Sequence, residues 1–167
     1  MILRKADTTE AQAIWTILQQ AIEQRKQDGS KQWQDGYPNL QTVMDDIAKG
    51  YAHVLVDETG IIAYAAIIFD IEPAYTAIQG KWLSNGDYMV VHRVATSNAA
   101  KRKGLGTLLF KKLEEICLEK KVPSIKVDTN FDNVPILKIL ERLDYTYCGE
   151  VFFRGSARKA FEKIIEI

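Results

Sequence analysis

The stretch His92-Arg93-Val94-Ala95-Thr96-Ser97-Asn98-Ala99-Ala100-Lys101-Arg102-Lys103-Gly104-Leu105-Gly106 decides the fold. It combines the end of an apolar strand, a loop with three consecutive cations, two glycines and the start of a helix. The first turn of a helix offers backbone N–H groups and the positive end of the helix dipole. Glycines let the backbone approach a bulky ligand closely. The stretch therefore predicts a binding site for a phosphate-bearing ligand.

Two common phosphate loops do not fit this stretch. A P-loop needs Gly-x-x-x-x-Gly-Lys-Ser/Thr, and a dinucleotide fingerprint needs a third glycine where Leu109 stands. The stretch resembles instead the acetyl-CoA signature Arg/Gln-x-x-Gly-x-Gly/Ala of the GCN5-related N-acetyltransferase (GNAT) family. Lys101, Gly104 and Gly106 take its three defined positions. Lysine departs from the usual arginine or glutamine: it keeps a charge but lacks the planar fork.

Length and charge narrow the function classes. A chain of 167 residues predicts a single domain over residues 1–167. The 22 basic and 22 acidic residues balance, which argues against nucleic acid as a partner. We expect no membrane span, signal peptide or metal site. The isolated Cys117 and Cys148 are typical of reduced thiols in a cytoplasmic protein.

Hydrophobic periodicity predicts the order β-α-α-β-β-β-α-β-α-β-β. The strands are expected over 2–5, 51–56, 61–69, 88–96, 124–129, 145–153 and 157–165, and the helices over about 11–22, 39–49, 105–117 and 132–143. Asp7 and Glu10 predict a capping box, and Asp132 is the expected cap of the last helix. In the second helix, the residues expected to face inward are Leu40, Val43, Met44 and Ile47. The residues from 157 on are expected to be a strand, with a helix as the alternative.

This order predicts an α/β fold with a mixed, mostly antiparallel central sheet and helices on both faces. It is also the order of the GNAT family, so the resemblance covers nearly the whole chain and implies the acyl-CoA N-acyltransferase fold. In that fold, the strand ending at Thr96 and the strand over 124–129 splay apart and hold the pantetheine arm. The implied acetyl-CoA contacts are Val94, Ala95, Thr96, Lys101, Arg102, Lys103, Gly104, Leu105, Gly106, Thr107 and Asn133.

His92 is the candidate general base. Strand alternation places it on one face with Tyr88, Val90, Val94 and Thr96, and it is the side chain in that row that titrates near neutral pH. Some family members carry a basic residue at a related position. The alternative for His92 is a core histidine bonded to a backbone carbonyl. His53 alternates away from Ala52, Val54 and Val56, and we expect it to be structural or solvated.

The other catalytic groups are less defined by the sequence. Asp128 ends the neighbouring strand, where it either attracts the amine cation or is simply solvated. Many family members protonate the departing thiolate with a tyrosine, but Leu140 takes that position here. Water, Tyr145 or Tyr147 is then the acid, and strand packing is the alternative for both tyrosines.

The segment Gln32-Trp33-Gln34-Asp35-Gly36-Tyr37-Pro38 predicts a loop with two exposed aromatics between the first two helices. Large aromatics in loops often bind ligands, so Trp33 and Tyr37 are candidate substrate contacts. The alternative is that both rings plug the core under the loop. The Trp-x-x-Gly-Tyr-Pro run resembles a bacterial branch of the family, and Trp82, in the long connection, is a weaker candidate of the same kind.

The sequence therefore predicts an acetyl-CoA-dependent N-acetyltransferase that moves an acetyl group to a primary amine by direct transfer in a ternary complex. The expected acceptor is a small-molecule or peptide amine, and a homodimer is kept open. No cysteine stands where a covalent acyl intermediate is expected. The alternatives are a non-catalytic acyl-CoA-binding regulatory module, which the absent tyrosine motivates, and a nucleotide-binding domain.

Overall fold

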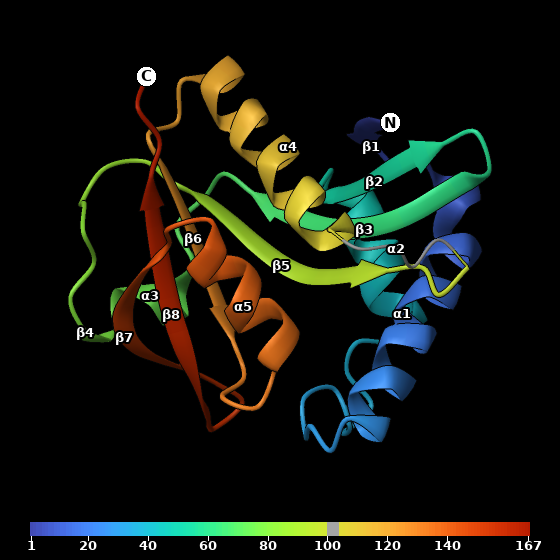
Figure 1. Ribbon diagram of the computed structural model, residues 1–167, viewed down its shortest axis with the longest axis horizontal. Helices are drawn as coiled ribbons and strands as arrows, with labels where there is room; N and C mark the ends of the chain where they lie inside the picture. The colour runs from blue at the N-terminus through green and yellow to red at the C-terminus, as the bar shows by residue number, and fades with distance from the viewer. Residues whose placement is uncertain (100–103) are drawn as a thin grey trace. The chain divides into compact units, whose positions relative to one another are not determined.

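The computed structural model describes residues 1–99 and 104–167 (Figure 1). The chain divides into two compact units, and each is described on its own. The first comprises residues 1–67 and 93–109, and the second residues 68–92 and 110–167. Strand β5 (Met89–Thr96) begins in the second unit and ends in the first. Helix α4 (Leu105–Lys120) begins in the first unit and ends in the second.

The strands of the first unit form an antiparallel ladder. Strand β1 (Ile2–Lys5) pairs with β2 (Ala52–Asp57), and β2 pairs with β3 (Gly60–Ile68). The turn between β2 and β3 is held by Asp57, whose carboxylate accepts the Thr59 N–H at 2.8 Å. The predicted hairpin is therefore confirmed, with both strands visible as neighbouring arrows in Figure 1.

Two helices of the first unit begin at side-chain caps. Asp7 and Glu10 form the predicted capping box at a short 3-10 turn (Thr8–Glu10), which leads into α1 (Ala11–Gln27). Asn39 and Thr42 cap α2 (Leu40–Ala48) in the same way. The buried core of the unit comes from α1, the loop after it, α2, β2, β3 and β5: Ile14, Ile17, Leu18, Ala21, Trp33, Val43, Ala52, Val54, Tyr64, Ala66 and Ala95.

The predicted inward face of α2 is wrong in part. Leu40 is 36% exposed and Met44 is 48% exposed, whereas Val43 and Asp46 are buried. The buried stripe runs through a carboxylate because Asp46 has a cationic partner inside the unit, described below. A hydrophobic pattern alone does not reveal such a pair.

The second unit has one parallel pair among its described pairings. β5 pairs with β6 (Ser124–Thr129) in parallel, through Val91 and Val127. The neighbours that follow are antiparallel: β6 with β8 (Ser156–Ile164), β8 with β7 (Thr146–Phe153), and β7 with β4 (Gln79–Gly80). The predicted fold class is confirmed as a mixed, mostly antiparallel sheet flanked by helices, and the last segment is a strand.

Two parts of the second unit differ from the sequence prediction. The long connection before β5 contains a short helix, α3 (Pro73–Thr76), as well as β4. Helix α5 (Val134–Arg142) is capped by Asn133 rather than by Asp132. Asp132 instead accepts the side-chain amide of Asn130 at 2.7 Å, so its carboxylate closes the preceding turn.

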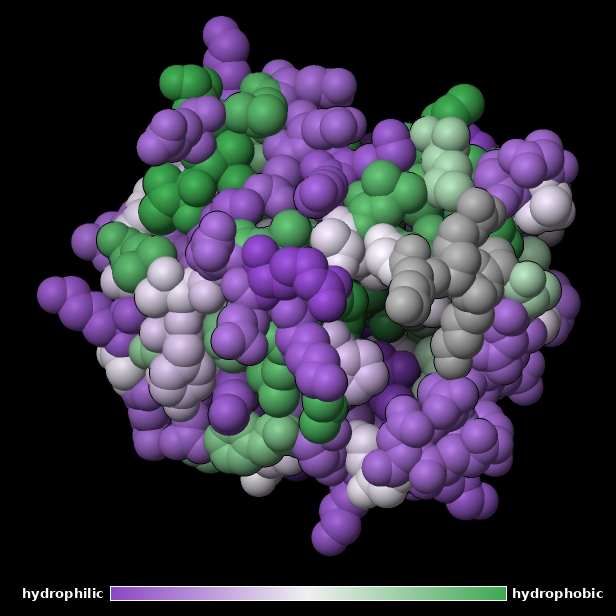
Figure 2. All heavy atoms as spheres, in the orientation of Figure 1, coloured by the Kyte–Doolittle hydropathy of each residue, from purple (hydrophilic) through white to green (hydrophobic). Residues whose placement is uncertain are grey.

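The face shown in Figure 2 is covered mainly by hydrophilic residues, with hydrophobic residues in small groups between them. Among the described residues, no helix has the length and apolar character needed to cross a bilayer.

Candidate active site

Strand β5 contains a residue with an unusual backbone conformation, Arg93. Its φ angle is 55°, in the left-handed region that residues other than glycine rarely adopt. A left-handed residue breaks the regular alternation of a strand. The common face of His92, Val94 and Thr96 stays a prediction.

A buried network in the first unit holds Arg93 in place. Its guanidinium donates to both carboxylate oxygens of Asp46, from Nε at 2.9 Å and from a terminal nitrogen at 2.6 Å. The other terminal nitrogen donates to the Tyr37 hydroxyl at 2.6 Å. Tyr64 completes the network by donating its hydroxyl to Asp46 at 2.6 Å. Such a network can maintain a backbone conformation that is costly in isolation.

The electrostatics of this network follow from its burial. Burial lowers the pKa of Arg93, but the hydrogen bonds to Asp46 and the nearby negative charge outweigh it, and the net shift is upward. Burial and the Asp46 carboxylate raise the pKa of Tyr64 far above its ordinary value. Arg93 is therefore a permanent cation and Tyr64 a permanent hydroxyl donor.

His92 lies between two carboxylates of the second unit. Its Nε2 is 3.4 Å from Glu72 Oε2, and its Nδ1 is 3.8 Å from Asp128 Oδ1. The imidazole also contacts the rings of Tyr75 and Phe153, at centroid distances of 6.3 and 5.8 Å. The structure thus brings the two predicted catalytic residues, His92 and Asp128, together.

A tyrosine also belongs to the cluster. Tyr75 on α3 donates its hydroxyl to Asp128 at 2.6 Å and is 1% exposed. Burial, together with the charge of Asp128, raises its pKa well above the ordinary value. Tyr75 therefore remains protonated and fixes one oxygen of Asp128 beside the imidazole.

Sequence analysis missed Glu72. Its side chain caps α3 by accepting the Ala74 N–H at 3.3 Å, and its backbone N–H donates to the Tyr88 hydroxyl at 3.1 Å. The Glu72-Pro73 pair is a recognisable helix start, since proline favours the first position. That signal predicts α3, but it does not reveal that α3 turns Glu72 toward His92.

The candidate acids lie away from this cluster. Tyr145 packs on Phe110 at a centroid distance of 6.0 Å, and burial raises its pKa well above the ordinary value. Its buried hydroxyl has no hydrogen-bond partner among the described residues. Tyr147 is 53% exposed and packs on Phe161. The structure does not bring either tyrosine into contact with His92, and a role as acid remains a prediction.

The two loop aromatics lie against the core of the first unit. Trp33 is 5% exposed, so its predicted exposure is wrong and the burial favours the core-plug alternative. The Arg25 guanidinium covers its ring at 3.8 Å from the centroid, and burial lowers the pKa of Arg25 to about 10. Tyr37 is partly buried and uses its hydroxyl as a partner for Arg93.

The predicted cofactor loop is described only in part. Lys101, Arg102 and Lys103 lie outside the described residues, so the structure does not place these three predicted contacts. Gly104 has a φ of 83°, and a Cβ built on it would meet nothing within 4 Å. Its carbonyl accepts the Leu108 N–H at 2.8 Å, which closes the first turn of α4. Leu105, Gly106 and Thr107 form that turn.

The other predicted cofactor contacts have local roles. The Val94 carbonyl accepts a bond from Arg25 at 3.4 Å, and Ser97, just after Thr96, donates its N–H to Ile62 at 2.8 Å. Ala95 is 4% exposed. The Asn133 side chain is buried and accepts the Ile136 N–H at 3.5 Å. These contacts fix the backbone positions that the sequence assigns to the cofactor.

Comparison with known proteins identifies the family. A sequence model of the acetyltransferase (GNAT) family matches residues 13–145. The crystal structure of a GNAT-family acetyltransferase from Streptococcus agalactiae is 38% identical, with a TM-score of 0.90, covering 99% of this chain and 96% of that one.

More distant structures share the fold. A GNAT-family acetyltransferase from Listeria monocytogenes is 20% identical with a TM-score of 0.78, and the alignment covers 98% of this chain and 94% of that one. The ribosomal-protein-S18-alanine N-acetyltransferase of Escherichia coli is 14% identical with a TM-score of 0.67, at 99% and 94% coverage. No curated protein matches the chain by sequence. The family match and the Streptococcus relative lead to one conclusion: the chain belongs to the GNAT family of N-acetyltransferases.

Proposed function

We propose that the chain, acting as one domain, transfers the acetyl group of acetyl-CoA directly to an amine, with His92 as the general base. One observation carries the proposal: the His92 imidazole lies between the carboxylates of Glu72 and Asp128. These two negative charges attract the cationic ammonium group of an incoming amine. The residue that follows His92 is Arg93, with its left-handed backbone conformation, after which β5 continues into the predicted cofactor segment.

The start of α4 fits an acidic ligand such as the pyrophosphate of acetyl-CoA. Gly104 leaves open space where a side chain would stand, and the first turn of α4 presents its N–H groups beside it. When bound, acetyl-CoA supplies the activated acetyl group. Val94 to Thr96, the loop from Lys101 to Gly106, and Thr107 hold it in this proposal, and Asn133 completes the set.

The proton path follows from the two contacts of the imidazole. In this proposal His92 carries its proton on Nε2, 3.4 Å from the Glu72 carboxylate that accepts it, so the lone pair of Nδ1 is left to take a proton from the incoming ammonium group. Asp128 lies 3.8 Å from Nδ1 and attracts that ammonium group to the same side. Tyr75 fixes the carboxylate of Asp128 and so acts as a positioning residue.

Direct transfer is supported by the state of the two cysteines. Cys117 is fully buried, and burial raises its pKa to about 12. A thiol with such a pKa is a poor nucleophile. Cys148 is 9% exposed, and burial raises its pKa as well. Both thiols are free rather than paired, which supports a reducing, cytoplasmic environment.

An acetylation screen tests the proposal. The purified chain is incubated with acetyl-CoA and a panel of amines that includes polyamines, amino acids, peptides and amine antibiotics, and the released thiol is measured. We expect turnover with at least one amine above the rate of acetyl-CoA hydrolysis. Saturable acetyl-CoA binding without transfer to any amine would favour the regulatory-module alternative instead.

A further inference from the structure

A pocket of the second unit is lined in part by Tyr75, the residue that contacts both Asp128 and His92. It has a volume of about 710 Å³ and is lined by α3, the connection to β5, and β6. Tyr75 contacts the Trp82 ring at 5.1 Å and the His92 ring at 6.3 Å, measured between centroids. The buried Tyr75 ring is therefore a wall shared by the two sites.

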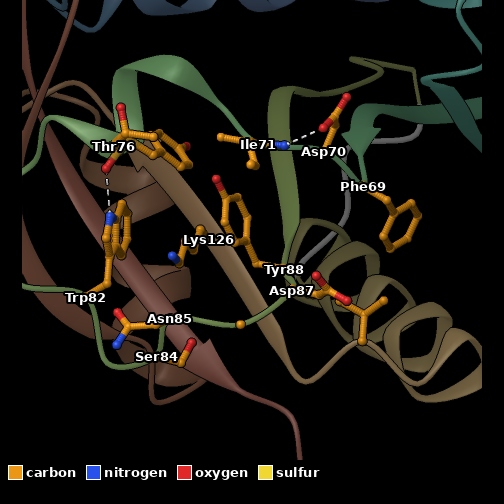
Figure 3. A pocket seen from close by; sticks show the side chains of 13 residues that line it. Phe69, Asp70, Ile71, Thr76, Trp82, Ser84, Asn85, Asp87, Tyr88 and Lys126 are labelled. Carbon is orange, nitrogen blue, oxygen red and sulfur yellow. Dashed lines mark hydrogen bonds between the residues drawn. The ribbon is translucent and has the colours of Figure 1, made fainter.

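The base of this pocket carries a buried cation. Lys126 on β6 is 3% exposed, and its Nζ lies 4.4 Å from the Trp82 ring centroid and 4.0 Å from that of Tyr88. Figure 3 shows the ammonium group between these two rings, directed into the pocket. A lysine is rarely buried to this extent unless a counter-charge accompanies it.

No carboxylate of the described residues pairs with Lys126. Its cross-strand partner is Glu162, whose carboxylate oxygens already accept other hydrogen bonds. One oxygen accepts the Leu83 N–H at 2.7 Å, and the other accepts the hydroxyls of Ser84 and Ser124. Burial lowers the pKa of Lys126, and the more distant charge of Glu162 opposes this only in part. An anion in the pocket would offset the cost of burying this ammonium group.

The hydrogen bonds that Glu162 accepts from Leu83 and Ser84 also fix one wall of the pocket. They anchor Leu83 and Ser84, which follow Trp82, while the indole N–H of Trp82 donates to the Tyr75 carbonyl at 2.9 Å. The wall that faces Lys126 is thus tied to both β8 and α3. A pocket with fixed walls binds a small ligand without the entropic cost of ordering a loop.

We propose that this pocket binds a small monocarboxylate with an aromatic body, whose carboxylate contacts Lys126 between Trp82 and Tyr88. The two rings offer flat surface for stacking. Asp70 and Asp87 also line the pocket, on the far side of Tyr88 in Figure 3, and they repel ligands with several negative charges. The site therefore selects a single carboxylate over a polyanion such as a nucleotide.

Calorimetric titration with matched probes tests the proposal. The probes are 3-phenylpropanoate, its neutral amide 3-phenylpropanamide, and citrate as a polyanion. We expect the carboxylate to bind at least about tenfold more tightly than the amide, since charge-assisted hydrogen bonds are strong, and citrate not to bind at this site. Equal affinity for acid and amide, or no saturable binding of the acid at millimolar concentration, would overturn the proposal.

Variants then locate the binding. Lys126→Met should remove the preference for the acid, whereas Lys159→Met should leave it unchanged. Lys159 is a matched control because it also lies over aromatic rings, Phe131 and Tyr147, but lines a different pocket. Thermal unfolding checks that both variants are folded. The comparison of acid with amide in the unmodified protein tests the proposal even if a variant fails to fold.

The test is independent of catalysis. The probe 3-phenylpropanoate has no amine and cannot be acetylated, so failure of the acetylation screen and failure of this titration are distinct results. His92→Gln should leave the binding unchanged. Loss of binding in His92→Gln would place the ligand at His92 and refute a separate site.

Discussion

Asp46→Ala should strongly destabilise the protein. The carboxylate accepts two short bonds from Arg93 and one from Tyr64, and its side chain is 5% exposed. Removing it leaves the guanidinium of Arg93 buried without its counter-charge. Breaking a buried pair on one side costs about 3–5 kcal/mol. For a chain of this length, that lowers the Tm by roughly 6–20 °C.

Chemical denaturation followed by circular dichroism measures the loss of unfolding free energy. Two other variants provide comparisons with smaller expected effects. Asp45→Ala is the matched control: Asp45 is the preceding residue of α2, is exposed, and its carboxylate accepts the Gln41 side-chain amide at 2.9 Å, so its loss should cost less than about 0.5 kcal/mol. Tyr64→Phe removes one donor and should cost about 1 kcal/mol.

A smaller effect would refute this reasoning. If Asp46→Ala lowered the free energy of unfolding by less than about 1 kcal/mol, Arg93 would not depend on Asp46 as its buried counter-charge. The variant also tests the link to function: Arg93 adjoins His92, so Asp46→Ala should reduce turnover at temperatures where the variant is still folded. Native turnover in a strongly destabilised but folded variant would separate the backbone conformation of Arg93 from catalysis.

Three further predictions concern the cofactor, the loop and alkaline pH. Gly106→Val should weaken acetyl-CoA binding by more than tenfold in calorimetry while the protein remains folded, because a branched side chain would block the first turn of α4. Trp33→Ala should cost about 3–5 kcal/mol of stability as a core truncation, whereas a rise in the KM for the amine without loss of stability would support substrate contact instead. The raised pKa values of Tyr75 and Cys117 mean that the unfolded chain releases their protons at lower pH than the folded chain, so the stability they contribute is present below about pH 9 and is lost above it. Thermal unfolding from pH 8 to 11 should show this decline, and a flat profile would contradict it.

Local patterns were sufficient for most of the fold. The capping box of Asp7 and Glu10, the turn after Asp57 and the bounds of β6 all follow from short-range chemistry that the sequence displays directly. The short α3 and β4 were missed because elements of four and two residues give no periodicity. The exposure of Met44 was missed because the face of α2 is decided by a partner distant in sequence.

The candidate site was predictable in its strand residues only. The strand patterns alone are enough to select His92 and Asp128 as candidates. In the structure His92 Nδ1 lies 3.8 Å from Asp128 Oδ1. Glu72 reaches His92 from a segment without periodicity, and the left-handed Arg93 has no sequence signature because it is neither glycine nor asparagine. Its conformation depends on Asp46, which contacts it across 47 residues of chain. Long-range pairs of this kind are invisible to local patterns.

The central claim is that His92 is the general base, and the pH profile of turnover tests it most directly. For an amine identified in the screen, kcat and kcat/KM are measured across the neutral range in the unmodified protein and in His92→Gln, with acetyl-CoA affinity measured in parallel. We expect that His92→Gln lowers kcat by about 10²-fold or more, removes the acid limb of the kcat/KM profile and leaves acetyl-CoA affinity nearly unchanged. Near-native kcat with an unchanged pH profile in His92→Gln would contradict the claim.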